Sequence, residues 1–365
     1  MEPSEGMVRQ SIGPDDSGQN PKVSVLMSVY NGEIHLGEAV ESILNQTFTD
    51  FEFIIVDDGS TDSTWSILSE YAVRDKRIVL IQNKNNIGLA KSLNKGLELA
   101  RGEYVARQDA DDLSLPERLA AQIGYSQQQP HVGLLGTAYY IINSQGQELA
   151  LHRQPESDTE IRWQMLFHNA FCHSSVMFRR KFINKESLFY KEGLPCSQDY
   201  ELWSRMLQQT SAANLTIPLV EWRKSDGAIS TTRREEQQRI ATIISAQQIK
   251  HLLPHKPITL SEVAMLRESY YGFSQRPGKQ HVQLCLLLVQ ILGAFKKQPE
   301  VDSVAWNRIF RSRIDHIVSC LIASRRWDAS AAAILADMLR LDALGIVMHL
   351  TRRAINSIDR KVKAA

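Results

Sequence analysis

The stretch Phe51-Glu-Phe-Ile-Ile-Val-Asp-Asp-Gly-Ser60 joins an apolar run to a polar turn. Its apolar residues are aromatic or β-branched, and these residue types are enriched in strands. The Asp-Asp-Gly-Ser sequence is typical of a tight turn, because Asp side chains accept from nearby backbone N–H groups and Gly tolerates positive φ. We therefore predict a buried strand at 51–56 whose carboxyl end carries two acidic side chains.

The same pattern recurs on both sides of this stretch. Strands are predicted at 22–28, 77–82 and 104–108, and helices between them at 34–46, 62–72 and 88–100. Strands that alternate with helices form βαβ units and a mostly parallel sheet. Ligands bind such sheets beyond the carboxyl ends of the strands. We therefore expect one crevice to collect the polar turns Tyr30-Asn31, Asp57-Asp58 and 109–112.

The chain divides into three predicted regions. Residues 1–20 are rich in Gly, Ser, Pro and acidic residues, so we expect a disordered tail without a targeting signal. Residues 21–230 form the α/β region. Residues 231–365 are predicted to be helical almost throughout, because apolar residues recur every three or four positions and prolines separate the segments. Further elements predicted in the α/β region are a helix at 116–128, short strands around 132–143 and at 173–179, and a helix that begins near Gln198.

Length and composition exclude several protein classes. A chain of 365 residues with 43% hydrophobic and 23% charged residues has ordinary globular composition and is long enough for two or three domains. Its four cysteines are far apart, which excludes a disulfide framework or a zinc ribbon and suits a reducing compartment. The longest apolar stretch, at 282–295, is shorter than the roughly 20 residues that span a bilayer. We therefore expect a cytoplasmic protein without a transmembrane helix.

The net charge of +1 conceals two opposite halves. Residues 1–230 contain 21 Lys and Arg against 30 Asp and Glu, a balance of −9. Residues 231–365 contain 21 against 11, a balance of +10, and the two balances sum to +1. Such asymmetry indicates an acidic site in the first part and an anionic partner for the second.

The acidic sequence Asp109-Ala-Asp-Asp112 follows the strand predicted at 104–108. Mg²⁺ and Mn²⁺ prefer oxygen ligands and commonly take one or two carboxylates together with phosphate oxygens. Two Asp side chains at a strand end could therefore hold a metal ion and a sugar hydroxyl. The alternative is an Asx turn that caps the following helix, because Asp is common at such positions.

Six sequence blocks have a characteristic order and spacing. They are Val23-Ser-Val-Leu-Met-Ser-Val-Tyr-Asn-Gly32, Ala39-Val-Glu-Ser-Ile-Leu-Asn-Gln-Thr47, Phe53-Ile-Ile-Val-Asp-Asp-Gly-Ser-Thr-Asp62, Asn85-Asn-Ile-Gly-Leu-Ala90, Ala100-Arg-Gly-Glu-Tyr104 and Gln108-Asp-Ala-Asp-Asp112. Together they closely resemble glycosyltransferase family 2, the inverting nucleotide-sugar enzymes with a GT-A fold. The resemblance covers about residues 21–230. It implies a Rossmann-like α/β fold with a mostly parallel central sheet, followed here by a C-terminal helical region.

The resemblance assigns the donor nucleotide to the first two polar turns. The positions that hold the base in the family are Tyr30 and Asp57-Asp58 in this chain, and Asp58 is the favoured contact. A carboxylate that accepts from a uracil or guanine N–H makes a strong, charge-assisted hydrogen bond. The alternative for this turn is a purely local role. Asp109 matches the family's position near the ribose.

The resemblance also implies a metal ion, Mn²⁺ or Mg²⁺, with Asp111 as its ligand. The ion would screen the donor diphosphate and stabilise it as it leaves, acting as a Lewis acid. Lys91 is a further candidate for contact with the diphosphate, because it follows the glycine of the fourth block.

An inverting transfer also needs a general base within reach of the acceptor hydroxyl. The sequence Cys196-Ser-Gln-Asp-Tyr-Glu-Leu-Trp-Ser-Arg205 resembles the family's Glu-Asp-x-x-Leu-Trp block, which places the base at Asp199. Gln198 replaces the usual Glu, so the neighbouring charge is missing. The alternative is that Asp199 only caps its helix.

Two further side chains are expected on the acceptor side. Trp203, one turn after Asp199, could pack under an acceptor sugar, and the alternative is a core tryptophan. His173 could contact phosphate or metal, and the alternative is a core histidine with satisfied hydrogen bonds.

The basic C-terminal region allows two interpretations. Its apolar stripes are predicted to pack on each other or on a second subunit, which leaves Arg and Lys in solvent. The excess positive charge could also dock on an anionic membrane surface, where lipid-linked acceptors are found. Nucleic acid is not an expected partner, because the basic residues are dispersed and no recognition motif accompanies them.

The sequence therefore predicts an inverting, metal-dependent hexosyltransferase of cell-surface polysaccharide or glycoconjugate synthesis. It would move a sugar from a nucleotide diphosphate donor, a UDP-sugar in the first place, to a glycan or lipid-linked acceptor. The expected location is the cytoplasm, including the inner face of the membrane. The alternatives are a nucleotidyltransferase that makes sugar nucleotides and an inactive family member that acts as a scaffold.

Overall fold

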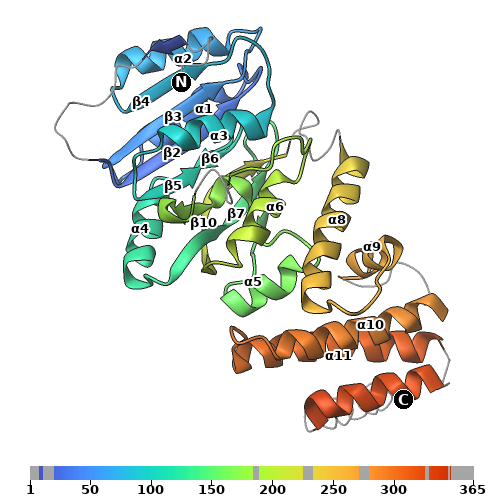
Figure 1. The fold of residues 1–365 in the computed structure, drawn as a ribbon. Coiled ribbons are helices and arrows are strands. Elements are labelled where there is room, and N and C mark those ends of the chain that lie inside the picture. The colour runs from blue at the N-terminus through green and yellow to red at the C-terminus, as the bar shows by residue number, and fades with distance from the viewer. Residues whose placement is uncertain are drawn as a thin grey trace, which may run out of the picture. The chain divides into compact units, whose positions relative to one another are not determined.

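A computed structural model describes residues 8–10, 20–183, 189–224, 233–270, 279–324, 329–343 and 346. These residues fall into two compact units (Figure 1). The boundary lies between Ala241 and Thr242, inside helix α8 (Arg234–Leu252), rather than at the expected position 230. The segment Arg162–His168 was expected in the α/β region but belongs to the second unit.

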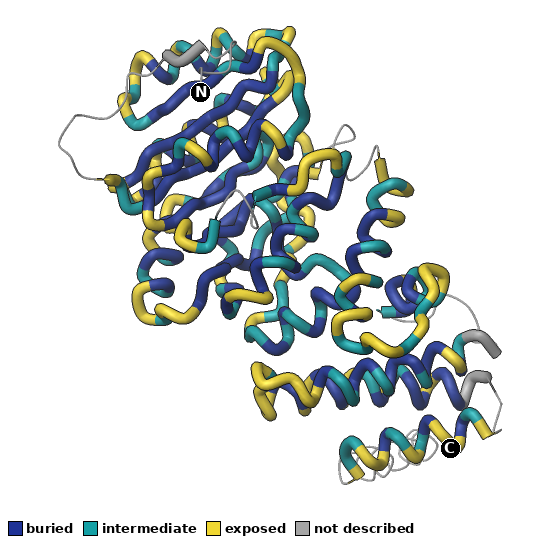
Figure 2. Tube along the Cα trace, in the orientation of Figure 1, coloured by how far each residue is buried: buried dark blue, intermediate teal, exposed yellow. Residues whose placement is uncertain are grey.

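The first unit is built on a parallel core of four strands. Its strand order is β4 (Ile78–Gln82), β3 (Phe51–Asp57), β2 (Val23–Val29) and β5 (Tyr104–Arg107), and each neighbouring pair is parallel. Every residue of β2 and β3 is buried (Figure 2). Because helices cover both faces of such a sheet, its strands are mostly apolar and buried on both faces, and the polar pair Ser24 and Glu52 is hydrogen-bonded at 2.7 Å. The predicted βαβ arrangement is therefore present.

The helices between these strands lie where the apolar spacing predicts them. In α1 (Leu36–Leu44) the buried side chains are Leu36, Ala39, Val40 and Ile43, which form one face of the helix. The remaining helices of this part are α2 (Thr64–Arg74), α3 (Leu89–Leu99) and α4 (Arg118–Gln128).

Beyond β5 the sheet is mixed rather than parallel. The strand β9 (Met177–Arg179) is antiparallel to both β5 and β7 (Val132–Ile142). The long strand β10 (Ser211–Arg223) is parallel to β7 and antiparallel to β6 (Leu113–Ser114). A last strand, β8 (Glu148–His152), pairs antiparallel with β7. The prediction of a mostly parallel sheet therefore holds for the N-terminal half only.

Two local predictions are corrected. The strand expected at 173–179 begins as a 3-10 turn, His173–Ser175, which interrupts the ladder and directs polar side chains toward the acidic turn at 109–112. The tail expected to be disordered contributes a strand, β1 (Val8–Gln10), which pairs antiparallel with β4. This pairing covers the exposed edge of the sheet. The other residues of the 1–19 segment lie outside the described part of the chain.

The second unit is helical, as expected. Its helices are α9 (Leu260–Glu268), α10 (Lys279–Lys296) and α11 (Ser303–Ser324), with the second half of α8 and the end of α5 (Asp158–Met165). Its core includes Phe310, Ile314 and Ile317 of α11, which the apolar spacing predicts to lie on one face. Across the residues that the structure describes, no helix is both long enough and apolar enough to cross a bilayer.

Gly59 provides a test of the turn after β3. Its φ is +73°, and a Cβ on this residue would lie 2.5 Å from the backbone carbon of Asn85. We expect Gly59→Ala to combine backbone strain with a backbone clash and to lower the free energy of unfolding by about 2–4 kcal/mol. Chemical denaturation measures the change.

Gly146 is the matched control for this substitution. Its φ is +79°, but nothing lies within 4 Å of the position that a Cβ would take. Gly146→Ala should therefore lose only the cost of strain, about 1 kcal/mol. Equal losses in the two variants would show that the Asp58-Gly59 turn does not pack tightly on the 83–88 loop.

Candidate functional site

The polar turns after β2, β3 and β5 lie together at the carboxyl end of the parallel core. The Asp58 N–H donates to Val29 O at 2.8 Å, and Thr61 N–H donates to the Asn31 side-chain oxygen at 2.9 Å. Asn31 adopts a positive φ of 51° at this contact. A Cβ on Gly32 would lie 3.9 Å from that of Ala110. The three polar turns that the sequence predicts to share one crevice therefore lie close together.

Both acidic residues of the second turn are buried and hold neighbouring backbone. Asp57 accepts from Ser60 N–H and from the Gln82 amide, each at 3.1 Å. Asp58 accepts from the Asn83 amide and from the N–H groups of Ile87 and Gly88, each at 2.9 Å. Asp58 thus fixes the loop that leads into α3.

The two outermost donor-side candidates are accessible. Tyr30 is 48% exposed at the end of β2. Lys91 is exposed in the first turn of α3, immediately after the loop that Asp58 holds.

Asp109 is held in its charged form by a buried cation. Arg107 forms an ion pair with one of its oxygens, and the Ser174 hydroxyl donates to the other at 2.9 Å. Burial raises the pKa of Asp109, but Arg107, His173 and the Ser174 hydroxyl outweigh it, so the pKa is lowered. Asp109 is therefore a charged acceptor immediately after β5.

Asp112, the last residue of the same turn, has a different environment. Its carboxylate is 1% exposed and accepts from the Ser174 hydroxyl and, at 2.7 Å, from the N–H of Arg223. Burial, together with the charges of Asp111 and Asp109, raises its pKa well above the usual range. Asp112 is thus a structural residue that links the turn to β10.

Asp111 is the member of the turn that is available to a ligand. Within the described part of the chain, no hydrogen bond from another residue's side chain reaches its carboxylate. Burial and the neighbouring Asp109 raise its pKa to about 6, so a bound cation would be favoured there. The described residues contain no group of three or more His, Cys, Asp or Glu that could hold a metal ion. A metal ion at Asp111 would therefore take its remaining ligands from the donor phosphates and water.

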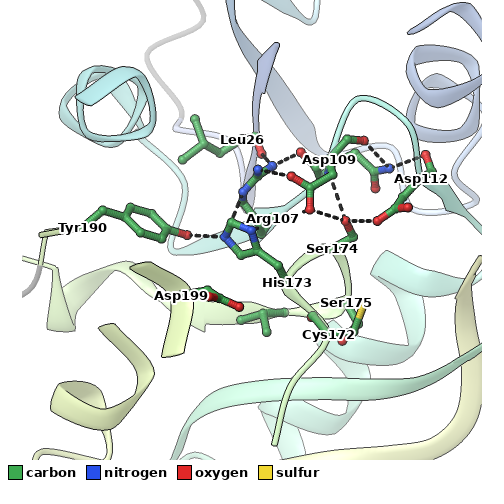
Figure 3. Close-up of polar contacts among 12 residues, drawn as sticks. Leu26, Arg107, Asp109, Asp112, Cys172, His173, Ser174, Ser175, Tyr190 and Asp199 are labelled. Carbon is green, nitrogen blue, oxygen red and sulfur yellow. Dashed lines mark hydrogen bonds and ion pairs between the residues drawn. The ribbon is translucent and has the colours of Figure 1, made fainter. Parts of the chain in front are cut away.

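Arg107 is the residue of the site that sequence reasoning missed. Its side chain is 0% exposed and donates to the backbone carbonyls of Leu26, at 3.2 Å, and Gln108. It also donates from Nε to His173 Nε2 at 3.1 Å (Figure 3). A charged residue at the end of an otherwise apolar strand, two positions before an aspartate, is the signal that could have identified it.

His173 belongs to this buried network. Its Nε2 accepts from Arg107 and lies 2.9 Å from the Tyr190 hydroxyl, while Nδ1 lies 3.6 Å from Asp109 (Figure 3). Burial and the charge of Arg107 lower its pKa to about 3, so the ring is neutral. The core-histidine alternative describes this arrangement, because its Nε2 is already occupied.

Asp199 lies in the first turn of α6 (Gln198–Met206) and keeps part of its surface exposed. The Asn169 amide donates to its Oδ2 at 2.7 Å. Burial, followed by the charge of Asp109, raises its pKa to about 6 despite the opposing backbone N–H of Tyr200. The residue before α6, Ser197, has a φ of 58°. Asp199 and the acidic turn therefore share one electrostatic environment.

Trp203 is not placed to contact an acceptor. It is 0% exposed, and its ring packs at 6.2 Å against both His173 and Tyr190. Its indole N–H is buried without a partner among the described residues. The expected acceptor contact is corrected in favour of the alternative, a core tryptophan, which supports the side chains of the site from behind.

Comparisons with known proteins agree on one family. The profile of Glycosyl transferase family 2 matches residues 24–187. An uncharacterized glycosyltransferase of Haemophilus influenzae is 33% identical over 241 residues, which is 64% of this chain and 75% of that protein. The UDP-Glc:alpha-D-GlcNAc-diphosphoundecaprenol beta-1,3-glucosyltransferase WfaP of Escherichia coli is 29% identical over 231 residues, 62% of this chain and 87% of that protein.

A solved structure extends the comparison to the fold. The crystal structure of residues 1–349 of S. aureus TarS in complex with UDP-GlcNAc has a TM-score of 0.53 and 18% identity, and the match covers 83% of this chain and 90% of that one. This likeness shows the fold: an α/β GT-A fold followed by a helical C-terminal region.

The stability of Asp199 variants tests the environment described for this carboxylate. Because its folded pKa of about 6 lies above the ordinary value of 3.8, its contribution to stability is full below pH 4 and is lost as pH rises through 6. Asp199→Asn removes this loss. Above pH 6 we expect the free energy of unfolding of the variant to exceed that of the wild type by on the order of 1–2 kcal/mol, with no gain below pH 4. The melting temperature should rise accordingly. A gain that does not depend on pH would contradict the assignment.

Proposed function

The chain belongs to glycosyltransferase family 2, and we propose that it transfers a sugar with inversion from a UDP-sugar to a glycan or lipid-linked acceptor. The observation that carries the proposal is the pair Asp111 and Asp199. Each is a partly exposed carboxylate, and both interact with Asp109 and with the buried Arg107. One side chain is suited to the leaving group and the other to the attacking hydroxyl.

The donor would bind across the three turns. Tyr30 is exposed where the base would stack, and the Asp57-Asp58 turn would face its N–H edge. Asp109, kept charged by Arg107, would accept from the ribose hydroxyls. Lys91 would stand near the diphosphate. For Asp58 to contact the base directly, one of its carboxylate oxygens must give up a hydrogen bond to the 83–88 loop.

Asp111 would hold Mn²⁺ or Mg²⁺ through a single carboxylate. When bound, the ion supplies Lewis-acid stabilisation of the charge on the departing nucleotide diphosphate. The raised pKa of Asp111 supports this role, because burial and Asp109 leave a negative site that a cation would neutralise. Asp112 would stay in its structural position beneath the turn.

Asp199 would act as the general base. It would take the proton of the acceptor hydroxyl as the hydroxyl oxygen attacks the anomeric carbon from the face opposite the nucleotide diphosphate. The bond from the anomeric carbon to the diphosphate oxygen breaks in the same displacement, which inverts the configuration. A pKa of about 6 leaves the carboxylate charged at pH 7.5 while making it more basic than an ordinary Asp.

The Escherichia coli relative is named as an enzyme that transfers glucose to a lipid diphosphate sugar. An acceptor of this class would present its anionic diphosphate and lipid at a membrane surface. The balance of +10 over residues 231–365 supports such a surface as a partner of the second unit. Activity in cell-surface polysaccharide synthesis follows from that acceptor.

The inactive-scaffold alternative predicts a different response to ligands. Isothermal titration with UDP should give heat only when Mn²⁺ or Mg²⁺ is present if the chain is an enzyme of this kind. The absence of binding under all conditions would favour the scaffold.

A release assay across UDP-, GDP- and dTDP-sugars then identifies the donor. Formation of pyrophosphate from a sugar phosphate would favour a nucleotidyltransferase.

The metal assignment is tested by Asp111→Asn. We expect this variant to lose the UDP binding that depends on Mn²⁺. Its transfer rate should fall by about 10²–10⁴-fold, because the diphosphate is no longer screened. Its melting temperature should not fall, since removing a buried negative charge relieves repulsion from Asp109.

Asp112→Asn is the matched control, because Asp112 is the next residue in the same turn. Because the pKa of Asp112 is raised well above its ordinary value, the neutral amide resembles the protonated acid that the fold favours, and the melting temperature should not fall. Metal-dependent UDP binding should be retained by the folded fraction. The reverse pattern in the two variants would place the metal at Asp112.

The general base is tested by the rate at different pH values. Transfer by the wild type should rise with pH and level off above an apparent pKa of about 6, because Asp199 must be deprotonated to accept the proton. Asp199→Asn should lower the rate by about 10²–10⁴-fold at every pH while leaving UDP affinity intact. Near-normal transfer by this variant would exclude Asp199 as the base.

A further inference from the structure

We infer that Asn169 is the positioning residue of the base: its amide orients the Asp199 carboxylate and holds it in the charged form. The inference rests on the proposed role of Asp199. It assigns a function to Asn169, which lies outside the sequence blocks that resemble the family.

The geometry of the amide is defined at both ends. Its Nδ2 donates to Asp199 Oδ2 at 2.7 Å, and its Oδ1 accepts from the N–H of Phe171 at 3.2 Å. A backbone N–H can only donate, so the second contact fixes which end of the amide carries the oxygen. The NH₂ group is therefore directed at the carboxylate and cannot exchange places with the oxygen.

The surroundings of Asp199 show why such a donor matters. Burial and the charge of Asp109 favour the protonated form, while the backbone N–H of Tyr200, that of Asp199 itself and then the charge of Arg107 favour the charged form. Tyr190 and His173 stand between these groups and are neutral, since burial raises the pKa of Tyr190 and lowers that of His173. On the helix itself, the neighbouring Gln198 carries no charge.

A neutral donor suits a general base better than a cation. A Lys or Arg in direct contact would lower the pKa of Asp199 so far that the carboxylate would accept protons poorly. An amide stabilises the charged form by a hydrogen bond alone, as the backbone N–H of Tyr200 also does. The site therefore keeps its only direct cation, Arg107, on Asp109 within the described residues.

Two substitutions separate positioning from packing. Asn169→Ala removes both contacts, whereas Asn169→Asp keeps the size and the acceptor for Phe171 N–H but replaces the donor with a negative charge. Loss of the donor disfavours the charged carboxylate, so the pKa of Asp199 rises. The acidic limb of the rate profile should move to higher pH in both variants, and further in Asn169→Asp.

The rate measured is UDP release from UDP-glucose in the presence of Mn²⁺. At pH 7 we expect at least a tenfold lower kcat in both variants, with the KM for the donor within about twofold of the wild type. The rate of Asn169→Ala should recover in part at pH 9. An equal loss at every pH, with an unmoved acidic limb, would overturn the inference.

Asn214 provides a matched control. It is a second buried asparagine of the same unit, and its amide donates to the carbonyls of Pro155 and Ala170 rather than to a carboxylate. Asn214→Ala should lower the melting temperature without moving the acidic limb. If Asn214→Ala moves the acidic limb as far as Asn169→Ala does, the shift is caused by a general loss of packing in the unit, and the inference is overturned.

A second measurement needs no substrate and separates this inference from the proposed function. Asp199→Asn is introduced into the wild type and into Asn169→Ala, and melting temperatures are followed from pH 4 to pH 9. The stabilisation by Asp199→Asn above pH 6 should be larger when Asn169 is absent, because the charged carboxylate then has no amide donor. Equal stabilisation in both backgrounds would overturn the inference even if Asp199→Asn abolishes transfer. An active Asp199→Asn enzyme would instead remove the base assignment and leave the hydrogen bond as measured.

Discussion

The site depends on one buried cation. Arg107 is fully enclosed, and a guanidinium in that position must be paired and hydrogen-bonded because its desolvation is costly. Asp109 provides the charge, and His173 with the carbonyl of Leu26 provides further acceptors. His173 in turn contacts Tyr190, whose backbone N–H and carbonyl are both bonded to the Asn94 side chain of α3. The acidic turn at 109–112 and the segment around Tyr190 are thus linked through the partners of a single arginine.

Three aspartates in one turn would repel each other in identical surroundings, but their surroundings differ. Asp109 has a cation and stays charged, Asp112 is enclosed and favours its proton, and Asp111 lies between these extremes. Neighbouring carboxylates acquire different roles when their environments separate their pKa values. Asp199 follows the same principle: burial raises its pKa, the backbone N–H of Tyr200 opposes the rise, and the Asn169 amide donates to its Oδ2.

Much of the first unit could be predicted from sequence because its signals are local. The apolar runs of β2 and β3 and the spacing in α1 depend on neighbours along the chain, and parallel strands place their polar turns at one edge. The antiparallel pairing of β6 with β10 joins residues more than a hundred positions apart, and no local pattern marks it. Arg107 and Asn169 were missed for a related reason: the role of a buried polar side chain depends on partners that only the folded chain brings together. Trp203 was ambiguous because an indole suits a core and a sugar equally well.

The segment Arg162–His168 has a consequence for how the protein can be divided. In sequence it is flanked on both sides by the first unit, yet Trp163, Leu166 and Phe167 are part of the hydrophobic core of the helical unit. A shortened protein that ends near Ala241 would leave these three large side chains without their core. Such newly solvated apolar surface promotes aggregation. The helical unit therefore buries the apolar side chains of a segment that leads directly into Asn169. For this reason the two units are not interchangeable modules.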